Sequence, residues 1–274
     1  MLTINIIGAG HVGTVLGRVF AASGSFVVQD VLTRSMSSAQ KAVAFIGSGT
    51  AVRKFADLRC ADVYLLAVGD DQIEAACHAL VCARSVAGAV VFHCSGALSS
   101  AHLQAAAQAR ALVASVHPIR SFADPEAVVR DFAGTFCGVE GDAKALELLT
   151  AALSASGARA VGIDAAAKTV YHAASVFASN YLVTVLDAAL RAYQAAGIPA
   201  PVARELALPL VTETVANVFR MGPAQALSGP IARGDFTTVA KQQRAVEAWD
   251  KTAGQLYQAL VKPTRDLARR KQKK

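Results

Sequence analysis

The chain has 274 residues, 54% of them hydrophobic, which is enough material for the core of one large or two medium-sized domains. Its formal net charge is +7, but five of these charges lie in the last six residues, so only +2 (7 − 5) remains for the rest. We therefore expect a disordered basic tail rather than a basic binding face, and no nucleic-acid partner. The tail charges are Arg269, Arg270, Lys271, Lys273 and Lys274.

Membrane insertion and secretion are not expected either. The most apolar helical stretch, residues 173–190, contains Asn180 and Asp187 and falls short of the ~18 to 20 uninterrupted apolar residues of a membrane span. The first residues lack the basic region of a secretory signal. Five cysteines without CxxC or metal-ligand spacing predict reduced thiols, no metal and a cytoplasmic protein.

Residues 2–22 predict a strand, a glycine turn and a helix. The turn has the spacing GxGxxG: Gly8 permits a tight turn, Gly10 removes the Cβ that would hold a phosphate away, and Gly13 lets the helix pack closely. The backbone N–H groups of His11 and Val12, with the helix dipole, then face the anion. The alternative is a purely structural turn, but the apolar strand before it and the periodic helix after it favour dinucleotide binding.

The second expected strand, residues 26–33, ends just before Arg34 and Ser35. This position usually selects between the two nicotinamide dinucleotides, because an acidic residue binds the ribose hydroxyls whereas arginine binds a 2′-phosphate. Arg34 with Ser35 favours NADP. Asp30 competes for the role but falls inside the strand, and the alternative for the pair itself is a helix cap beside a solvated arginine.

Further strands are expected near residue 51 and at residues 63–68, 89–94, 112–116, 135–139 and 158–163, with helices between them. This alternation predicts an α/β fold, a doubly wound parallel sheet of the Rossmann type, over residues 1–163. Ligands of such sheets collect at the carboxyl ends of the strands, where Val68, Ser95 and His117 lie. Ser95 either faces the nicotinamide or substrate, or caps the following helix.

From residue 164 onward only helices are expected, at residues 164–196, 201–220, 223–227 and 239–269, which makes 164–274 an all-helical second domain. The first of these helices would be roughly 50 Å long. So long an apolar helix exposes more hydrophobic surface than a monomer usually tolerates. We therefore expect a homodimer formed through the helical domain.

The long helix carries an unusual set of polar residues. Lys168 and His172 are four residues apart and share one face, and Asn180 lies at the border of that face. In a cleft against the nucleotide domain, His172 would donate the proton, Lys168 would orient the substrate or lower the pKa of the histidine, and Asn180 would hold a substrate oxygen, with Ser95 and His117 approaching from the other side. The alternative is a core histidine and a solvated lysine.

The chain resembles Rossmann-like proteins with a DUF2520 domain, relatives of the 6-phosphogluconate and β-hydroxyacid dehydrogenase architecture that are often described as NADP- or F420-dependent oxidoreductases. The resemblance implies nicotinamide binding and a dimerising helical domain. In β-hydroxyacid dehydrogenases a lysine and an asparagine four residues apart serve catalysis, whereas His172 follows Lys168 here. The matching stretches are IIGAGHVG, TRS, LLAVGDDQI, VVFHCSGALSS, SVHPIRSFADP, GTFCGVEGD, YHAASVFASNYLV and SGPIARGD.

The expected function is an NADP(H)-dependent oxidoreductase that transfers a hydride to or from a small carbonyl, imine or hydroxy compound in an interdomain cleft. A protein that binds NADPH as a sensor or scaffold, without turnover, explains the glycine turn equally well. Reduction through F420 rests on the resemblance alone. The substrate itself is not encoded in the fold or the cofactor motif.

Overall fold

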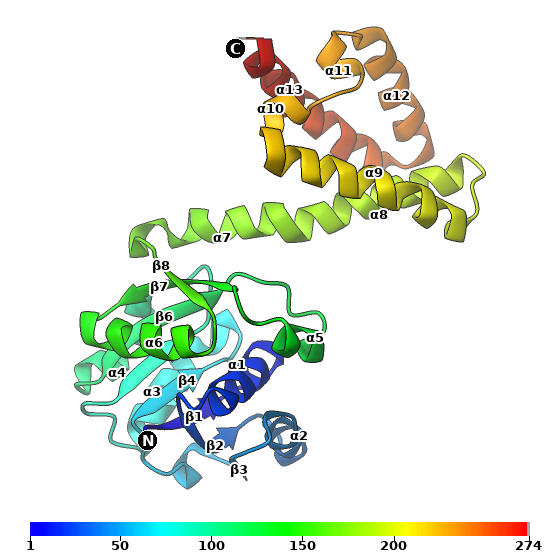
Figure 1. Ribbon diagram of the computed structural model, residues 1–274. Coiled ribbons are helices and arrows are strands. Elements are labelled where there is room, and N and C mark those ends of the chain that lie inside the picture. Colours follow the sequence, from blue (N-terminus) through cyan, green and yellow to red (C-terminus); the bar gives the residue numbers. More distant parts are fainter. Residues whose placement is uncertain (273–274) are drawn as a thin grey trace. The chain divides into compact units, whose positions relative to one another are not determined.

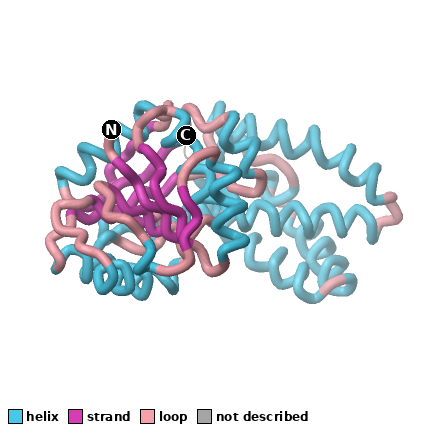
Figure 2. Tube along the Cα trace, turned by 90° about the horizontal axis from the view of Figure 1, so that it is seen from below, coloured by secondary structure: helices cyan, strands magenta, loops and turns pink. Residues whose placement is uncertain are grey.

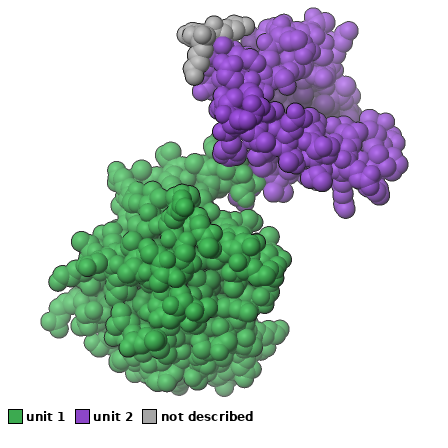
Figure 3. Space-filling model, in the orientation of Figure 1, with its two compact units in different colours: residues 1–179 green, residues 180–274 purple. Residues whose placement is uncertain are grey.

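The computed structural model describes residues 1–272 and divides them into two compact units, residues 1–179 and the residues from 180 onward (Figures 1 and 3). The first unit includes helix α7 (Lys168–Val176), which we expected to begin the second domain. The compact unit that contains the sheet thus extends to residue 179, whereas the domain boundary was expected after residue 163.

The first unit is built on one eight-stranded sheet with the order β3-β2-β1-β4-β5-β6-β7-β8, drawn in magenta in Figure 2. All eight strands lie within a few residues of the expected ranges. The sheet is mostly parallel, as expected. The exception is the β6–β7 pair, which is antiparallel and places Glu140 opposite Ser115 and Gly138 opposite His117. The strands are β1 (Thr3–Ile7), β2 (Val27–Leu32), β3 (Thr50–Val52), β4 (Val63–Leu66), β5 (Val90–His93), β6 (Leu112–Pro118), β7 (Phe136–Gly141) and β8 (Arg159–Gly162).

The sheet is buried on both faces, which confirms the doubly wound architecture. Along β4, Val63 and Leu65 belong to one hydrophobic cluster, whereas Tyr64 and Leu66 belong to the other. Successive side chains of a strand point to opposite faces, so a continuous apolar run is typical of a strand covered on both sides. One cluster contains residues of α1 (His11–Ala22), α2 (Met36–Ile46), α5 (Pro125–Arg130) and α6 (Ala143–Ala155), and the other contains residues of α3 (Ile73–Ala83) and α4 (Gln104–Gln108).

The long helical stretch is interrupted by one π-helical turn, Phe177–Tyr181, between α7 and α8 (Leu182–Ala195). Taken together, Ala165–Ala195 is long and apolar enough to cross a membrane, with a mean hydropathy of 1.4 over 18 residues, none of them buried. The criterion concerns length and composition alone, and the helix of a soluble protein also meets it. The sequence expectation rested on a different criterion, an uninterrupted apolar run, which Asn180 and Asp187 break.

The second unit continues with α9 (Ala200–Met221), α10 (Pro223–Ala226), α11 (Pro230–Arg233), α12 (Phe236–Trp249) and α13 (Lys251–Gln272). The expected single helix over residues 239–269 is two helices, because Asp250 interrupts it and its carboxylate accepts from Ala253 N at 3.0 Å. The expectation of a disordered tail was wrong for residues 269–271, which are helical, while Lys273 and Lys274 lie outside the described residues.

Candidate functional site

The glycine turn after β1 has the geometry that its spacing predicts. Gly8 has a φ of +84°, and a Cβ there would lie 2.7 Å from Val68 Cγ1. A Cβ on Gly13 would lie 2.9 Å from Ala67 Cβ, so this glycine allows close helix packing. Beside Gly10, in contrast, a Cβ would meet nothing within 4 Å. The turn therefore leaves open space at the one position where a backbone-bound phosphate needs it.

Helix α1 begins directly at this space. Gly10 is its N-cap residue and offers no side-chain acceptor, and the first turn contains no acidic residue. The first N–H groups of a helix have no intrahelical acceptor, so those of His11 and Val12 can serve an anion. The imidazole of His11 is already engaged, since its Nδ1 lies 2.6 Å from Phe122 O. His11 therefore offers its backbone rather than its ring.

At the end of β2, Asp30 is excluded as the ribose ligand. Its side chain is 1% exposed and pairs with Arg59 Nη2 at 2.6 Å, inside the strand as expected. Ser35 is the N-cap residue of α2 and accepts from Ser38 N at 3.1 Å. Arg34 is exposed and makes no hydrogen bond or ion pair within the described part of the chain. Its guanidinium is thus available to a ligand.

The hydroxyl of Ser95 holds the loop after β5 in place through three hydrogen bonds. Ser95 Oγ donates to Asp70 Oδ2 at 2.8 Å and accepts from Ala97 N at 3.1 Å and from Leu98 N at 2.9 Å. These bonds close a turn and do not cap a helix, because the next helical turn begins at Ser100 with Ser99 as its N-cap residue. They leave the hydroxyl no free hydrogen bond for a nicotinamide. Asp70 follows β4, so the contact ties together the carboxyl ends of two neighbouring strands.

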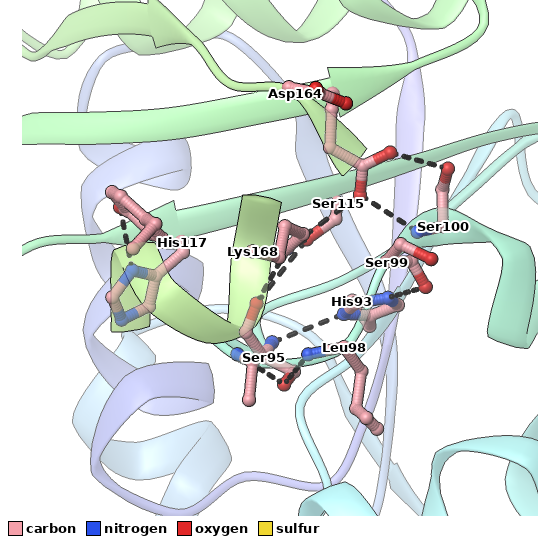
Figure 4. A network of polar contacts seen from close by, with 12 residues as sticks. His93, Ser95, Leu98, Ser99, Ser100, Ser115, His117, Asp164 and Lys168 are labelled. Atoms are coloured by element: carbon pink, nitrogen blue, oxygen red, sulfur yellow. Dashed lines mark hydrogen bonds and ion pairs between the residues drawn. The ribbon is translucent and has the colours of Figure 1, made fainter. Parts of the chain in front are cut away.

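Lys168 lies in a buried polar network rather than at an exposed surface (Figure 4). The residue is 1% exposed, and its Nζ donates to Ser95 O at 2.9 Å and to Ser115 Oγ. Glu140 Oε1 lies 3.6 Å away. Burial lowers the pKa of Lys168, and the Glu140 carboxylate opposes this shift. The alternative of a solvated lysine was wrong, and the ammonium is engaged before any substrate could bind to it.

A second group of polar side chains joins the end of β6 to α7. His117 Nδ1 and Tyr171 Oη lie 2.8 Å apart, and the rings of His117 and His172 meet edge to face with centroids 5.4 Å apart. Burial, followed by the charges of His172 and Lys168, lowers the pKa of His117 to about 4. Burial raises the pKa of Tyr171 to about 12. Both groups are therefore uncharged near pH 7.

His172 is not a core histidine bonded to backbone. Its Nδ1 is buried and has no hydrogen-bond partner among the described residues. A Cβ on Gly96 would collide with this nitrogen and would lie 2.8 Å from His117 Nε2. Asn180 is exposed and belongs to the second unit, so its expected role stays a prediction.

The sequence interpretation missed Tyr171, Glu140 and Gly138. Gly138 on β7 makes room for the tyrosine, because a Cβ there would lie 2.9 Å from Tyr171 Cζ. Glu140 accepts from Ser100 N at 2.8 Å and from Ser100 Oγ at 2.7 Å, which fixes its carboxylate beside Lys168. A glycine inside a strand indicates a close approach of another group, and this signal could have directed attention to Gly138.

Two protein-family models match the chain, and each of them includes part of the candidate site. Residues 1–118 match the Rossmann-like domain, and residues 135–264 match the domain of unknown function DUF2520. The chain carries a Rossmann-like domain followed by a DUF2520 domain. The Rossmann-like match supplies Gly96 and His117, and the DUF2520 match supplies Glu140, Tyr171 and His172.

Solved structures similar to the chain span nearly its whole length. A protein from Thermotoga maritima has 27% identity and a TM-score of 0.75, covering 98% of this chain and 100% of its own. A Bacteroides fragilis protein to which an NADP oxidoreductase activity is ascribed has 21% identity and a TM-score of 0.81, covering 97% and 98%. An imine reductase from Myxococcus stipitatus in complex with NADP+ has 19% identity and a TM-score of 0.69, covering 97% and 94%. Comparison with curated proteins gives no match.

Proposed function

We propose that the chain is an NADP(H)-dependent oxidoreductase that transfers a hydride to or from a small carbonyl, imine or hydroxy compound. The observation that carries the proposal is the open space beside Gly10 in the same sheet that holds His117 at the end of β6. Dinucleotides bind across the carboxyl ends of such sheets, with one nucleotide over each half. The β1–β3 half would take the adenosine end, and the β4–β6 half the nicotinamide end.

The residues present fit an NADP molecule. The N–H groups at the start of α1 would bind the pyrophosphate, and the guanidinium of Arg34 would bind the 2′-phosphate. The bound nicotinamide supplies or accepts the hydride. His172 and His117 offer the polar groups that a reacting oxygen or nitrogen needs as its charge changes. The Bacteroides and Myxococcus proteins support the same activity by their similarity.

The alternative is a protein that binds NADPH as a sensor or scaffold without turnover. An activity screen distinguishes the two functions. A panel of small carbonyls, imines and hydroxy acids is tested for turnover at the NADPH absorbance band, and the panel is repeated with F420 as the cofactor. Turnover of any member supports the enzyme, and tight NADPH binding without turnover supports the sensor. The proposal includes a cytoplasmic location, where thiols such as the five free cysteines stay reduced.

Replacing Arg34 by alanine is expected to weaken NADPH binding by about 1.5 to 3 kcal/mol while leaving NADH binding nearly unchanged, because only NADPH loses a charge-assisted contact. Isothermal calorimetry with both nucleotides measures the difference. Arg130→Ala removes another exposed arginine and should affect neither, whereas Gly10→Val should abolish both by steric exclusion. Equal losses for the two nucleotides would remove the 2′-phosphate assignment.

We also propose a homodimer formed through the helical unit. Large apolar side chains on its helices are exposed, among them Val183 (65%), Leu208 (68%) and Phe219 (86%). Light scattering is expected to report a dimer at micromolar concentration, and Leu208→Glu with Phe219→Glu should shift it toward the monomer. Glu213→Lys changes an exposed polar position of the same helix and should not. A monomeric wild-type chain would overturn this proposal.

A further inference from the structure

Gly96 is a glycine for reasons of space rather than backbone conformation. Its φ is not in the left-handed region, so the backbone accepts any L-residue. A side chain at this position would nevertheless collide with Nδ1 of His172 and crowd Nε2 of His117. Two imidazole nitrogens from different elements, the end of β6 and helix α7, therefore converge on the same point beside one backbone atom.

One buried nitrogen of these two rings lacks a hydrogen-bond partner within the described part of the chain. Nδ1 of His117 is occupied by Tyr171 at 2.8 Å, and Nε2 of His117 faces Gly96. Nδ1 of His172 faces the same point beside Gly96 and is buried without a partner among residues 1–272. A buried polar nitrogen normally has a partner. The His117 ring can supply one, since its centroid is 5.4 Å from that of His172.

The charged groups near the two rings are already bound to other residues, so the donors that remain for His172 are uncharged. The ammonium of Lys168, whose charge acts on His117, is held by Ser95, Ser115 and Glu140. The Asp70 carboxylate accepts from Ser95 Oγ. Neither is free to exchange protons with His172. Tyr171 and His117 are both uncharged near neutral pH, as described above.

We propose that Tyr171, His117 and His172 form a proton relay that passes beside Gly96 and ends at Nε2 of His172, which would face the substrate. Tyr171 Oη donates to His117 Nδ1, and His117 Nε2–H donates to His172 Nδ1 after a small rotation of the rings. This arrangement leaves a proton on His172 Nε2. Tyr171 and His117 are positioning residues in this scheme, and His172 is the catalytic residue. The inference rests on the proposed function.

The proton transfers balance without a charged imidazole. The substrate oxygen or nitrogen, made basic by the arriving hydride, takes the proton of His172 Nε2. His172 Nδ1 takes the proton of His117 Nε2, and His117 Nδ1 takes that of Tyr171 Oη. Solvent then returns a proton to the phenolate, and both imidazoles change back to the first tautomer. An alkoxide or amide is a stronger base than a phenolate, so the net transfer is downhill.

Nitrogen-15 NMR of the histidine rings tests the relay in the nucleotide-free protein. In the wild type, His117 is expected to carry its proton on Nε2, and Tyr171→Phe should convert it to a mixture of tautomers. Gly96→Ala should change the Nδ1 shift of His172 and the Nε2 shift of His117, because its Cβ would meet both nitrogens. Gly162→Ala is the matched control, because a Cβ there meets nothing within 4 Å and its backbone also permits alanine. Unchanged His117 shifts in Tyr171→Phe, or unchanged His172 shifts in Gly96→Ala, would overturn the inference.

Turnover supplies the second measurement once a substrate is found. Gly96→Ala and Tyr171→Phe are each expected to lower kcat by about tenfold or more while the Kd for NADPH stays within about twofold. Melting temperatures measured alongside identify any variant that fails to fold. If NADPH does not bind to the wild type, the proposed function fails while the NMR result still stands. If NADPH binds and both variants keep full kcat, the relay is overturned and the function stands.

Discussion

Replacing Glu140 by glutamine is expected to lower the free energy of unfolding by about 3 to 5 kcal/mol, because it leaves the buried ammonium of Lys168 without its compensating charge. The two side chains are 7% and 2% exposed, and the other partners of Lys168 are an uncharged carbonyl and a hydroxyl. Urea unfolding followed by circular dichroism measures the effect. Glu126→Gln is the matched control, since it removes a carboxylate paired with Arg18 at 3.3 Å on the surface of the same unit. Exposed pairs contribute about 0 to 1 kcal/mol.

The double variant Lys168→Met, Glu140→Gln measures how much of the effect comes from the interaction between the two side chains. It should be less destabilised than the sum of the two single variants, because neither partner is then left as an isolated charge. A Glu140→Gln variant as stable as the control would show that the buried ammonium needs no counter-charge.

The pH dependence of stability provides a check on the same pair. Burial lowers the pKa of Lys168 below its usual value of 10.5, so the unfolded chain binds more protons than the folded one between the lowered pKa and 10.5. The contribution of Lys168 to the free energy of unfolding therefore rises with pH in that window. Lys168→Met should remove this rise.

Replacing His172 by alanine is expected to lower turnover by ~10²-fold while leaving NADPH affinity nearly unchanged, the effect of losing one acid–base group. This corresponds to roughly 2.7 kcal/mol of transition-state stabilisation. The physical reason is the position of the ring, which lies against His117 and Gly96 rather than in a hydrophobic core.

Steady-state kinetics and calorimetry measure the two quantities separately. His78→Ala is the control, because His78 is an exposed helical histidine whose ring lies near Cys82, far along the chain from the site. A His172→Ala variant with full turnover would assign the ring a packing role and favour the sensor over the enzyme.

The sequence predicted the parts of the fold that depend on local patterns. The glycine turn could be interpreted in detail, because each of its glycines is required for a different steric reason and all of these reasons concern nearby residues. The apolar run over residues 63–68 likewise predicted a strand, which the structure has at Val63–Leu66. The direction of β7 was not predictable, because strand periodicity is the same in parallel and antiparallel pairs.

The candidate site was predicted less completely for a related reason. His117, Lys168 and His172 were singled out by type and position, and the structure brings all three together in the first unit. The burial of Lys168 was missed because it depends on Glu140, which reaches the lysine only through the antiparallel pairing of β7 with β6. Tyr171 was missed because a tyrosine beside two polar residues on a helix looks like a packing residue until its hydroxyl is seen against His117.

The two glycines that admit the aromatic rings of α7 have an evolutionary consequence. Gly96 makes room for His172, and Gly138 makes room for Tyr171, so each ring shares a fixed volume with a residue on another element. A larger residue on one side of such a pair can be accommodated only by a smaller one on the other. Among homologous chains, positions 96 and 172 should therefore co-vary, as should positions 138 and 171. A lineage that fills position 96 should also have given up the imidazole at position 172 and the proton chemistry that depends on it.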